Sequence, residues 1–209
     1  MISKDRQRNR NNRKSKRVIL VAYEGKKNKT ENNYFSNFNG REKDYVIRIV
    51  PGSETDPINL VRQTIQEVKK LGLDLNEDDK AFCIFDTDND PKKNQQIKEA
   101  IELAKKHNIK IITSSPCIES WFLLHFEYTT ATMSSEDVIK KLKKHYPKYS
   151  KNCDIYHDIF EKTELACKNA KKLEKYQRDN NRDLQSVEAN PHSDVYQIIE
   201  ELNKYSNAK

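Results

Sequence analysis

Four short apolar runs restrict this chain to a narrow set of folds. Each run is five or six residues long and rich in β-branched side chains, which indicates a strand buried on both faces. The segments between them carry apolar residues at helical spacing. Strands that alternate with helices in this way predict an α/β fold, a mostly parallel sheet flanked by helices. The runs are Val18–Ala22, Tyr45–Val50, Ala81–Phe85 and Ile109–Thr113.

Helices are expected between the strands and throughout the second half of the chain. Residues 57–71 carry an apolar stripe at helical spacing, which Gly72 ends. A sheet part over about residues 18–115 and a helical part over about 116–209 that folds back onto it would form one domain, 18–209. Further helices are predicted over 33–38, after Pro91, over 117–127, from Ser134 to about His145, over 157–178, and from Ser193 to about Tyr205.

The net charge is concentrated at the N-terminus. The 209 residues have a formal net charge of +7, and residues 1–17 alone hold eight basic residues against one acidic residue. This segment has no hydrophobic pattern, so a disordered basic tail is predicted. It could neutralise nucleic-acid phosphates in a salt-dependent way, although a solubility tail or a contact with an acidic partner would use the same charges. Its basic residues are Lys4, Arg6, Arg8, Arg10, Arg13, Lys14, Lys16 and Arg17.

Several classes of protein are disfavoured by what the sequence lacks. No apolar stretch approaches the roughly 20 residues of a membrane span. The apolar run behind the basic N-terminus is too short for a signal peptide, so no membrane association and a cytoplasmic location are expected. The four cysteines are far apart and the five histidines show no metal-binding spacing, which favours reduced thiols over disulfides or zinc.

Acidic side chains follow two of the predicted strands. Glu24 comes directly after the first run, and Asp86, Asp88 and Asp90 follow the third. Ligands of parallel sheets bind at the carboxyl ends of strands, so these carboxylates converge if the two strands are neighbours. Clustered carboxylates repel one another unless a cation offsets them, and hard oxygen ligands suit Mg²⁺ or Mn²⁺. The alternative is that the aspartates only favour the N-terminus of the next helix.

Four motifs, in order along the chain, resemble those of the RloB-like family. The third is the most specific, although Ser115 stands where the family usually has Asn. The first motif is looser than the family pattern EGxxTE.xYF at Lys27 to Lys29. The motifs are Glu24-Gly25 with Thr30-Glu31-Asn32-Asn33-Tyr34-Phe35, then Phe85-Asp86-Thr87-Asp88, then Ser115 through Phe126, and finally Asn190-Pro191-His192-Ser193-Asp194-Val195.

This resemblance implies a fold, a chemistry and a biological setting. RloB-like proteins are counted among the Toprim-related folds, which carry a glutamate after the first strand and an Asp-x-Asp after a later one. Toprim domains occur in primases, topoisomerases and nucleases that use Mg²⁺ on phosphodiesters. Family members are typically encoded beside an ABC-like ATPase in restriction or abortive phage-resistance loci of prokaryotes. A partner ATPase and an antiviral role are therefore expected from the resemblance alone.

The resulting hypothesis is metal-assisted phosphodiester cleavage of RNA or DNA. Asp86 and Asp88 would hold the metal, and Glu24 would be a further ligand or the general base for water. Lys26 is a candidate phosphate contact. The alternatives are a non-catalytic adaptor or regulator of the ATPase with a vestigial acidic site, and a different phosphoryl-transfer enzyme. The chain has no P-loop, so it is not itself expected to be the ATPase.

Other polar residues of the motifs are candidates for supporting roles. Glu119 and His125 are six residues apart on a predicted helix and do not share a face, so only one of them, Glu119, is expected to point at the carboxylates as a further catalytic residue. His125 is as readily a core histidine. Glu31 and Asp90 could support the site, or could be charges in the first turn and at the N-terminus of helices.

Overall fold

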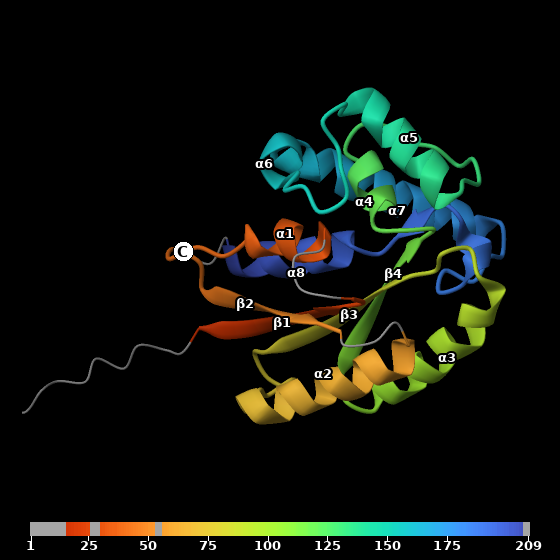
Figure 1. Ribbon diagram of the computed structural model, residues 1–209. Helices are drawn as coiled ribbons and strands as arrows, with labels where there is room; N and C mark the ends of the chain where they lie inside the picture. The colour runs from red at the N-terminus through yellow and green to blue at the C-terminus, as the bar shows by residue number, and fades with distance from the viewer. Residues whose placement is uncertain (1–15, 26–29, 53–55, 207–209) are drawn as a thin grey trace, which may run out of the picture.

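The computed structural model describes residues 16–25, 30–52 and 56–206 of the chain. Its centre is a five-stranded sheet with helices on both faces (Figure 1). The order across the sheet is β2-β1-β3-β4-β5. The predicted α/β fold with a mostly parallel sheet is confirmed. The strands are β1 (Arg17–Tyr23), β2 (Tyr45–Pro51), β3 (Lys80–Asp86), β4 (Ile109–Ser115) and β5 (His192–Ser193).

The four longer strands pair in parallel, and they are the strands that the apolar runs predict. The fifth strand was not predicted. β5 is two residues long and pairs antiparallel with the last two residues of β4. The last helix was predicted to begin at Ser193. In the structure Ser193 belongs to the sheet, where its hydroxyl hydrogen-bonds that of Ser114 at 3.0 Å. The helix α8 (Tyr196–Ser206) begins three residues later. The strand was missed because two residues are too few to show the alternating pattern of a strand in the sequence.

One face of the sheet is covered by α2 (Pro57–Leu71) and α3 (Pro91–Lys105), the lower layer in Figure 1. Both helices begin with an aspartate N-cap followed by proline, since Asp56 accepts from the Asn59 N–H and Asp90 from the Lys92 N–H. Gly72 ends α2 in the left-handed conformation, at φ 63°, as predicted. The apolar stripes of these helices bury against the sheet in a core that includes Leu60, Val61, Cys83, Phe85, Ile97, Ala100 and Ile111.

The opposite face is covered by α1 (Thr30–Ser36) and α8, with the remaining helices stacked beyond them (Figure 1). This second core is aromatic: the Trp121 indole N–H donates to the Tyr34 hydroxyl at 3.0 Å, and Tyr34 also meets Phe122 edge-on. The core thus joins the first and third motifs. The remaining elements are α4 (Glu119–Leu123), α5 (Ser135–His145), α6 (Tyr156–Ile159), η1 (Phe160–Lys162), α7 (Thr163–Asp179) and η2 (Val187–Ala189).

The helix predicted over 33–38 is α1, Thr30–Ser36, and two further predicted helices are shortened or divided in the structure. The helix expected over 117–127 is a regular α-helix only over α4. Beyond it the chain continues in turns, in which the His125 and Phe126 N–H groups each donate to the carbonyl three residues earlier. The single helix expected over 157–178 is divided into α6, η1 and α7, because the backbone at Ile159 (φ −116°) and Lys162 (φ −96°) departs from helical geometry. The spacing of apolar side chains does not record such a local break. Among the described helices, none is long and apolar enough to cross a bilayer.

Candidate functional site

The sheet brings the two predicted acidic segments together. β1 and β3 are adjacent, parallel and in register, with Tyr23 opposite Ile84. Glu24 directly follows β1, and Asp86 is the last residue of β3, so both lie at the same carboxyl edge. The two strands are neighbours, which is the condition for these carboxylates to converge. Gly25 turns the chain behind Glu24 at φ 99°, a conformation that favours glycine.

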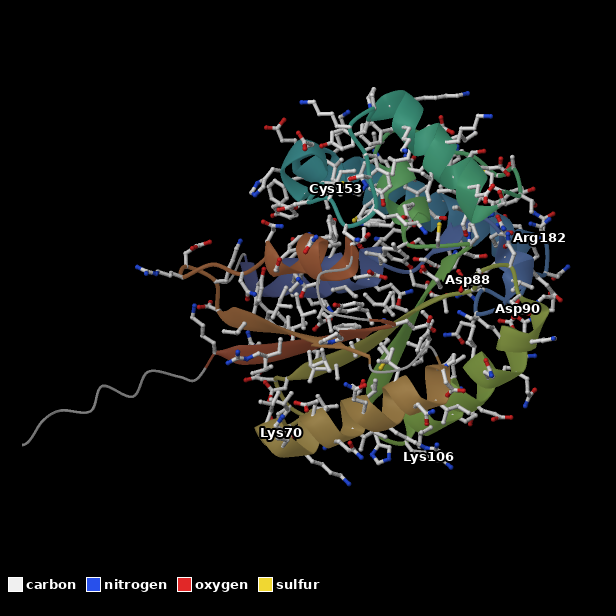
Figure 2. All side chains as sticks on the ribbon, viewed as in Figure 1. Lys70, Asp88, Asp90, Lys106, Cys153 and Arg182 are labelled. Atoms are coloured by element: carbon white, nitrogen blue, oxygen red, sulfur yellow. The ribbon has the colours of Figure 1, made fainter. Side chains whose placement is uncertain are left out.

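The turn after β3 is held in an unusual conformation. Asp88 and Asn89 are both left-handed, at φ 51° and 55°, which non-glycine residues adopt at a cost. The Asp88 N–H donates to the Pro116 carbonyl at 2.9 Å. The Asn190 amide donates to Asn89 Oδ1 at 2.5 Å, so the closing motif fixes the acidic turn. Figure 2 shows Asp88 and Asp90 at the end of the sheet opposite the start of β1.

A lysine that the sequence analysis did not single out lies within the acidic cluster. Lys93, from the first turns of α3, places its ammonium 2.7 Å from Asp88 Oδ2 and 3.4 Å from Glu24 Oε2. It also donates to the backbone carbonyl of Asp86 at 3.1 Å. The Lys93 and Glu24 side chains are only 15% and 14% exposed, so this is a largely desolvated contact. The chain supplies its own cation where the carboxylates meet.

Two carboxylate oxygens of the cluster nevertheless have no hydrogen-bond partner among the described residues: Glu24 Oε1 and Asp86 Oδ1 are buried and unpaired. Burial, followed by the negative charges of Glu31 and Glu119, raises the pKa of Asp86 well above its ordinary range. Burial also raises the pKa of Glu24 to about 7, against the opposing effect of Lys93. The ionised forms of both carboxyls are therefore disfavoured where they stand, and a bound proton or cation would offset that cost.

Glu119 joins the cluster from the first turn of α4. It is buried, and its carboxylate accepts a hydrogen bond from the Tyr149 hydroxyl at 2.8 Å. Burial and the neighbouring Glu119 charge raise the pKa of Tyr149, so the phenol stays protonated as the donor. Burial, with Glu119 and Asp86 close by, also raises the pKa of the Cys117 thiol. Tyr149 lies in a loop with no motif around it, so the sequence offers no signal for this contact.

The other predicted residues fall in different places. Glu31 is buried in the first turn of α1 and contributes negative charge at Asp86 and Glu24. Asp90 caps α3. His125 is fully buried against Trp121, whose carbonyl its Nδ1 contacts at 3.0 Å. Within the described part of the chain, the His125 ring contacts the Trp121 ring and backbone and makes no hydrogen bond to the carboxylates. Glu119, in contrast, lies close to Asp86.

The predicted basic residues lie largely outside the described part of the chain. Arg6, Arg8, Arg10, Arg13, Lys14 and Lys26 belong to residues 1–15 and 26–29, which the structure does not describe. Arg17 is the first residue of β1, where it pairs with Asp78 at 3.0 Å and lies over the Tyr205 ring. Lys16 donates to the Arg41 carbonyl at 2.8 Å. These last two basic residues are engaged by the folded domain.

The donor set suits a hard divalent cation, because it consists of carboxylate oxygens, two of them buried without a partner. In residues 16–25, 30–52 and 56–206, however, no three histidine, cysteine or acidic side chains form a group that could hold a metal ion as they stand. The Lys93 ammonium lies between Glu24 and Asp88 and provides the positive charge there. A metal bound by these residues would have to replace Lys93.

Substitution of Lys93 by Met tests this competition. We expect Mn²⁺ to bind about tenfold more tightly, because the ammonium no longer occupies the carboxylates. Without metal, the variant should lose about 1–2 kcal/mol of unfolding free energy, because Glu24 and Asp88 would repel each other unpaired. Calorimetric titration and urea unfolding in chelator measure both effects. Lys92→Met, an exposed neighbour on α3, is the control; unchanged Mn²⁺ affinity in Lys93→Met would contradict the prediction.

Comparison with known proteins matches the chain to a protein family. A family model described as RloB-like protein matches residues 19–202, which span the sheet, most of α8 and the residues of the acidic cluster. No curated protein matches the chain, and no solved structure does.

Proposed function

This chain belongs to the RloB-like family, and on that premise we propose that it is a metal-dependent nuclease that cleaves phosphodiesters of RNA or DNA. The observation that carries the proposal is the meeting of Glu24, Asp86 and Asp88 at the carboxyl edge of the sheet, with two buried and unpaired carboxylate oxygens. Burying a carboxylate costs free energy unless a proton or cation offsets its charge. A divalent metal bound at this edge of the sheet, as in Toprim domains, would be that cation.

The residues of the site would divide the work as follows. Mg²⁺ or Mn²⁺ held by Asp86, Asp88 and Glu24 would stabilise charge on the scissile phosphate. In the alternative in which Glu24 is not a ligand, its carboxylate, with a pKa raised by burial to about 7, would accept a proton from the attacking water near neutral pH. The hydrogen bond from Tyr149 holds Glu119 in place beside Asp86. Lys93, once displaced from the carboxylates, would be free to contact a phosphate oxygen.

The setting of this activity is also part of the proposal. The basic segment 1–17 would hold nucleic-acid backbone through its concentrated positive charge. The family resemblance supports an effector of prokaryotic anti-phage defence that works with an ABC-like ATPase encoded nearby. An effector that degrades nucleic acid needs restraint, which fits control by such a partner.

Calorimetric titration of the full chain with Mn²⁺, followed by cleavage assays on single-stranded RNA and DNA, tests the proposed function. The wild type is expected to bind Mn²⁺ and to cleave one of the two polymers. Asp86→Ala/Asp88→Ala should abolish both, because two of the three proposed ligands are lost. Glu99→Ala/Glu102→Ala removes two exposed carboxylates from the outer face of α3 and should change neither result. Cleavage that persists in Asp86→Ala/Asp88→Ala would refute the assignment.

The internal Lys93 cation favours one alternative, a non-catalytic adaptor of the partner ATPase. In that case Lys93 is permanently paired with Glu24 and Asp88, and the acidic cluster is a structural remnant. The adaptor would bind no Mn²⁺, and the Asp86→Ala/Asp88→Ala variant would keep full biological effect in cells. The same titration therefore separates the two candidate functions.

A further inference from the structure

The outer edge of β4 is only partly covered. β5 pairs with the last two residues of β4, and the chain then turns into α8. The Thr113 backbone faces this edge, because its carbonyl accepts from the Asp194 N–H at 2.9 Å. Backbone groups alternate sides along a strand, so the N–H and C=O of Ile111 face the same way. No strand in the described part of the chain pairs with Ile111 on that side.

A groove of about 430 Å³ follows this uncovered edge. Ile109 and Ile111 of β4 line it, with Ile101 of α3 from one helical layer and Gln197 of α8 from the other. Leu184 lies toward the covered end, where its carbonyl accepts from the Thr113 hydroxyl at 3.3 Å. The groove therefore combines apolar side chains with unpaired strand backbone, which is what an added strand requires.

The rim of the groove carries an excess of basic residues, two of which are already paired with acids, Lys105 with Glu102 at 2.9 Å and Arg178 with Glu174 at 2.8 Å. Its lining includes four basic residues and a single exposed acid, Asp183, while the other acid, Asp194, is buried and hydrogen-bonded by Thr113 and His192. Lys110 is exposed and has no ion pair among the described residues. The four basic residues are Lys105, Lys110, Arg178 and Arg182.

We propose that this groove binds an extended, acidic segment of a partner protein, which adds to the sheet as a strand along β4. Backbone hydrogen bonds to Ile111 would give affinity, apolar side chains would fill the groove beside Ile109, and acidic side chains would meet Lys110 and Arg182. The chain's own N-terminal segment is a poor occupant, because its first 17 residues carry eight basic residues and would repel the rim.

Selection from a displayed library of random peptides of about eight residues, against the full chain, tests this site. We expect the selected sequences to alternate apolar and acidic residues. Binding should slow hydrogen exchange of the Ile111 amide. Lys110→Glu/Arg182→Glu should weaken the selected peptide by at least about tenfold in fluorescence anisotropy. Lys106→Glu is the matched control, because Lys106 directly follows α3 but does not line the groove (Figure 2). This variant should leave the affinity for the peptide unchanged.

Three results would overturn the proposal: no binders, selected peptides without acidic residues, or binding that the charge reversal does not weaken. Protection of the Ile111 amide by a single-stranded oligonucleotide in place of a peptide would assign the groove to nucleic acid and would also overturn it. Arg182 donates to Gln177 at 3.0 Å, so Lys110→Glu alone is the second variant, free of that contact. Lys110→Glu should weaken binding of the selected peptide without changing the thermal unfolding of the chain.

Discussion

Replacement of Asp86 by Asn is expected to stabilise the chain while removing its proposed activity. Asp86 Oδ1 is buried without a partner, and burial, with Glu31 and Glu119 nearby, raises the pKa of this carboxyl well above its ordinary range. An amide keeps the shape of the side chain and does not titrate, so it removes the free-energy cost of burying this carboxyl. We expect the free energy of unfolding at pH 7 to rise by about 1–2 kcal/mol, and metal-dependent cleavage to fall by at least about 10²-fold.

The effect of Asp86→Asn should depend on pH in a defined direction. The folded-state pKa of Asp86 lies above its unfolded value, so the folded chain loses stability as the pH rises through and beyond the ordinary aspartate range. The gain in Asp86→Asn should therefore be larger at about pH 8 than at about pH 5. Urea unfolding in chelator measures it. Asp90→Asn, in which asparagine replaces one good N-cap by another, is the control and should be neutral.

A variant Asp86→Asn less stable than the wild type in chelator would be the contrary result. It would mean that a neighbouring cation such as Lys93 stabilises the charged form of Asp86, and that burial and the other carboxylates do not destabilise it. The proposed nuclease function would then rest on the family match alone.

Acid is expected to weaken the fold through His125. This side chain is fully buried, its Nδ1–H donates to the Trp121 carbonyl, and Nε2 has no partner among the described residues. Burial lowers the pKa of His125 to about 4. The unfolded chain takes up a proton near the ordinary histidine pKa, whereas the folded chain does not. Stability is therefore lost as the pH falls from about 6.5 to about 4, by up to about 3 kcal/mol.

The variant His125→Asn isolates this contribution, because its amide nitrogen takes the position of Nδ1 and does not titrate. It should be less stable than the wild type at pH 7, by about 1–3 kcal/mol, since packing on Trp121 is lost. Its unfolding free energy should then change less between pH 7 and pH 4. Guanidinium unfolding over this range gives both slopes; equal slopes would show that His125 is not a buried neutral imidazole.

Local features of the sequence were sufficient for most of the sheet and for the outer helices. The apolar runs predicted β1 to β4, because a strand buried on both faces has almost no polar positions. The bounds of α2 were predicted from its apolar stripe and from Gly72, both of which act within one helix. β5 and the division of α6 from α7 were not predicted, because one is too short for a pattern and the other is a break in backbone angles.

The candidate site divides in the same way. By itself, the sequence determined that Glu24, Asp86 and Asp88 lie at or just after the ends of strands, because each follows an apolar run within three residues. Only the tertiary structure decided that a lysine from α3 lies between them and that Tyr149 holds Glu119. A strand end is set by neighbours in the sequence, whereas these contacts join residues that are distant along the chain and meet only when helices pack on the sheet.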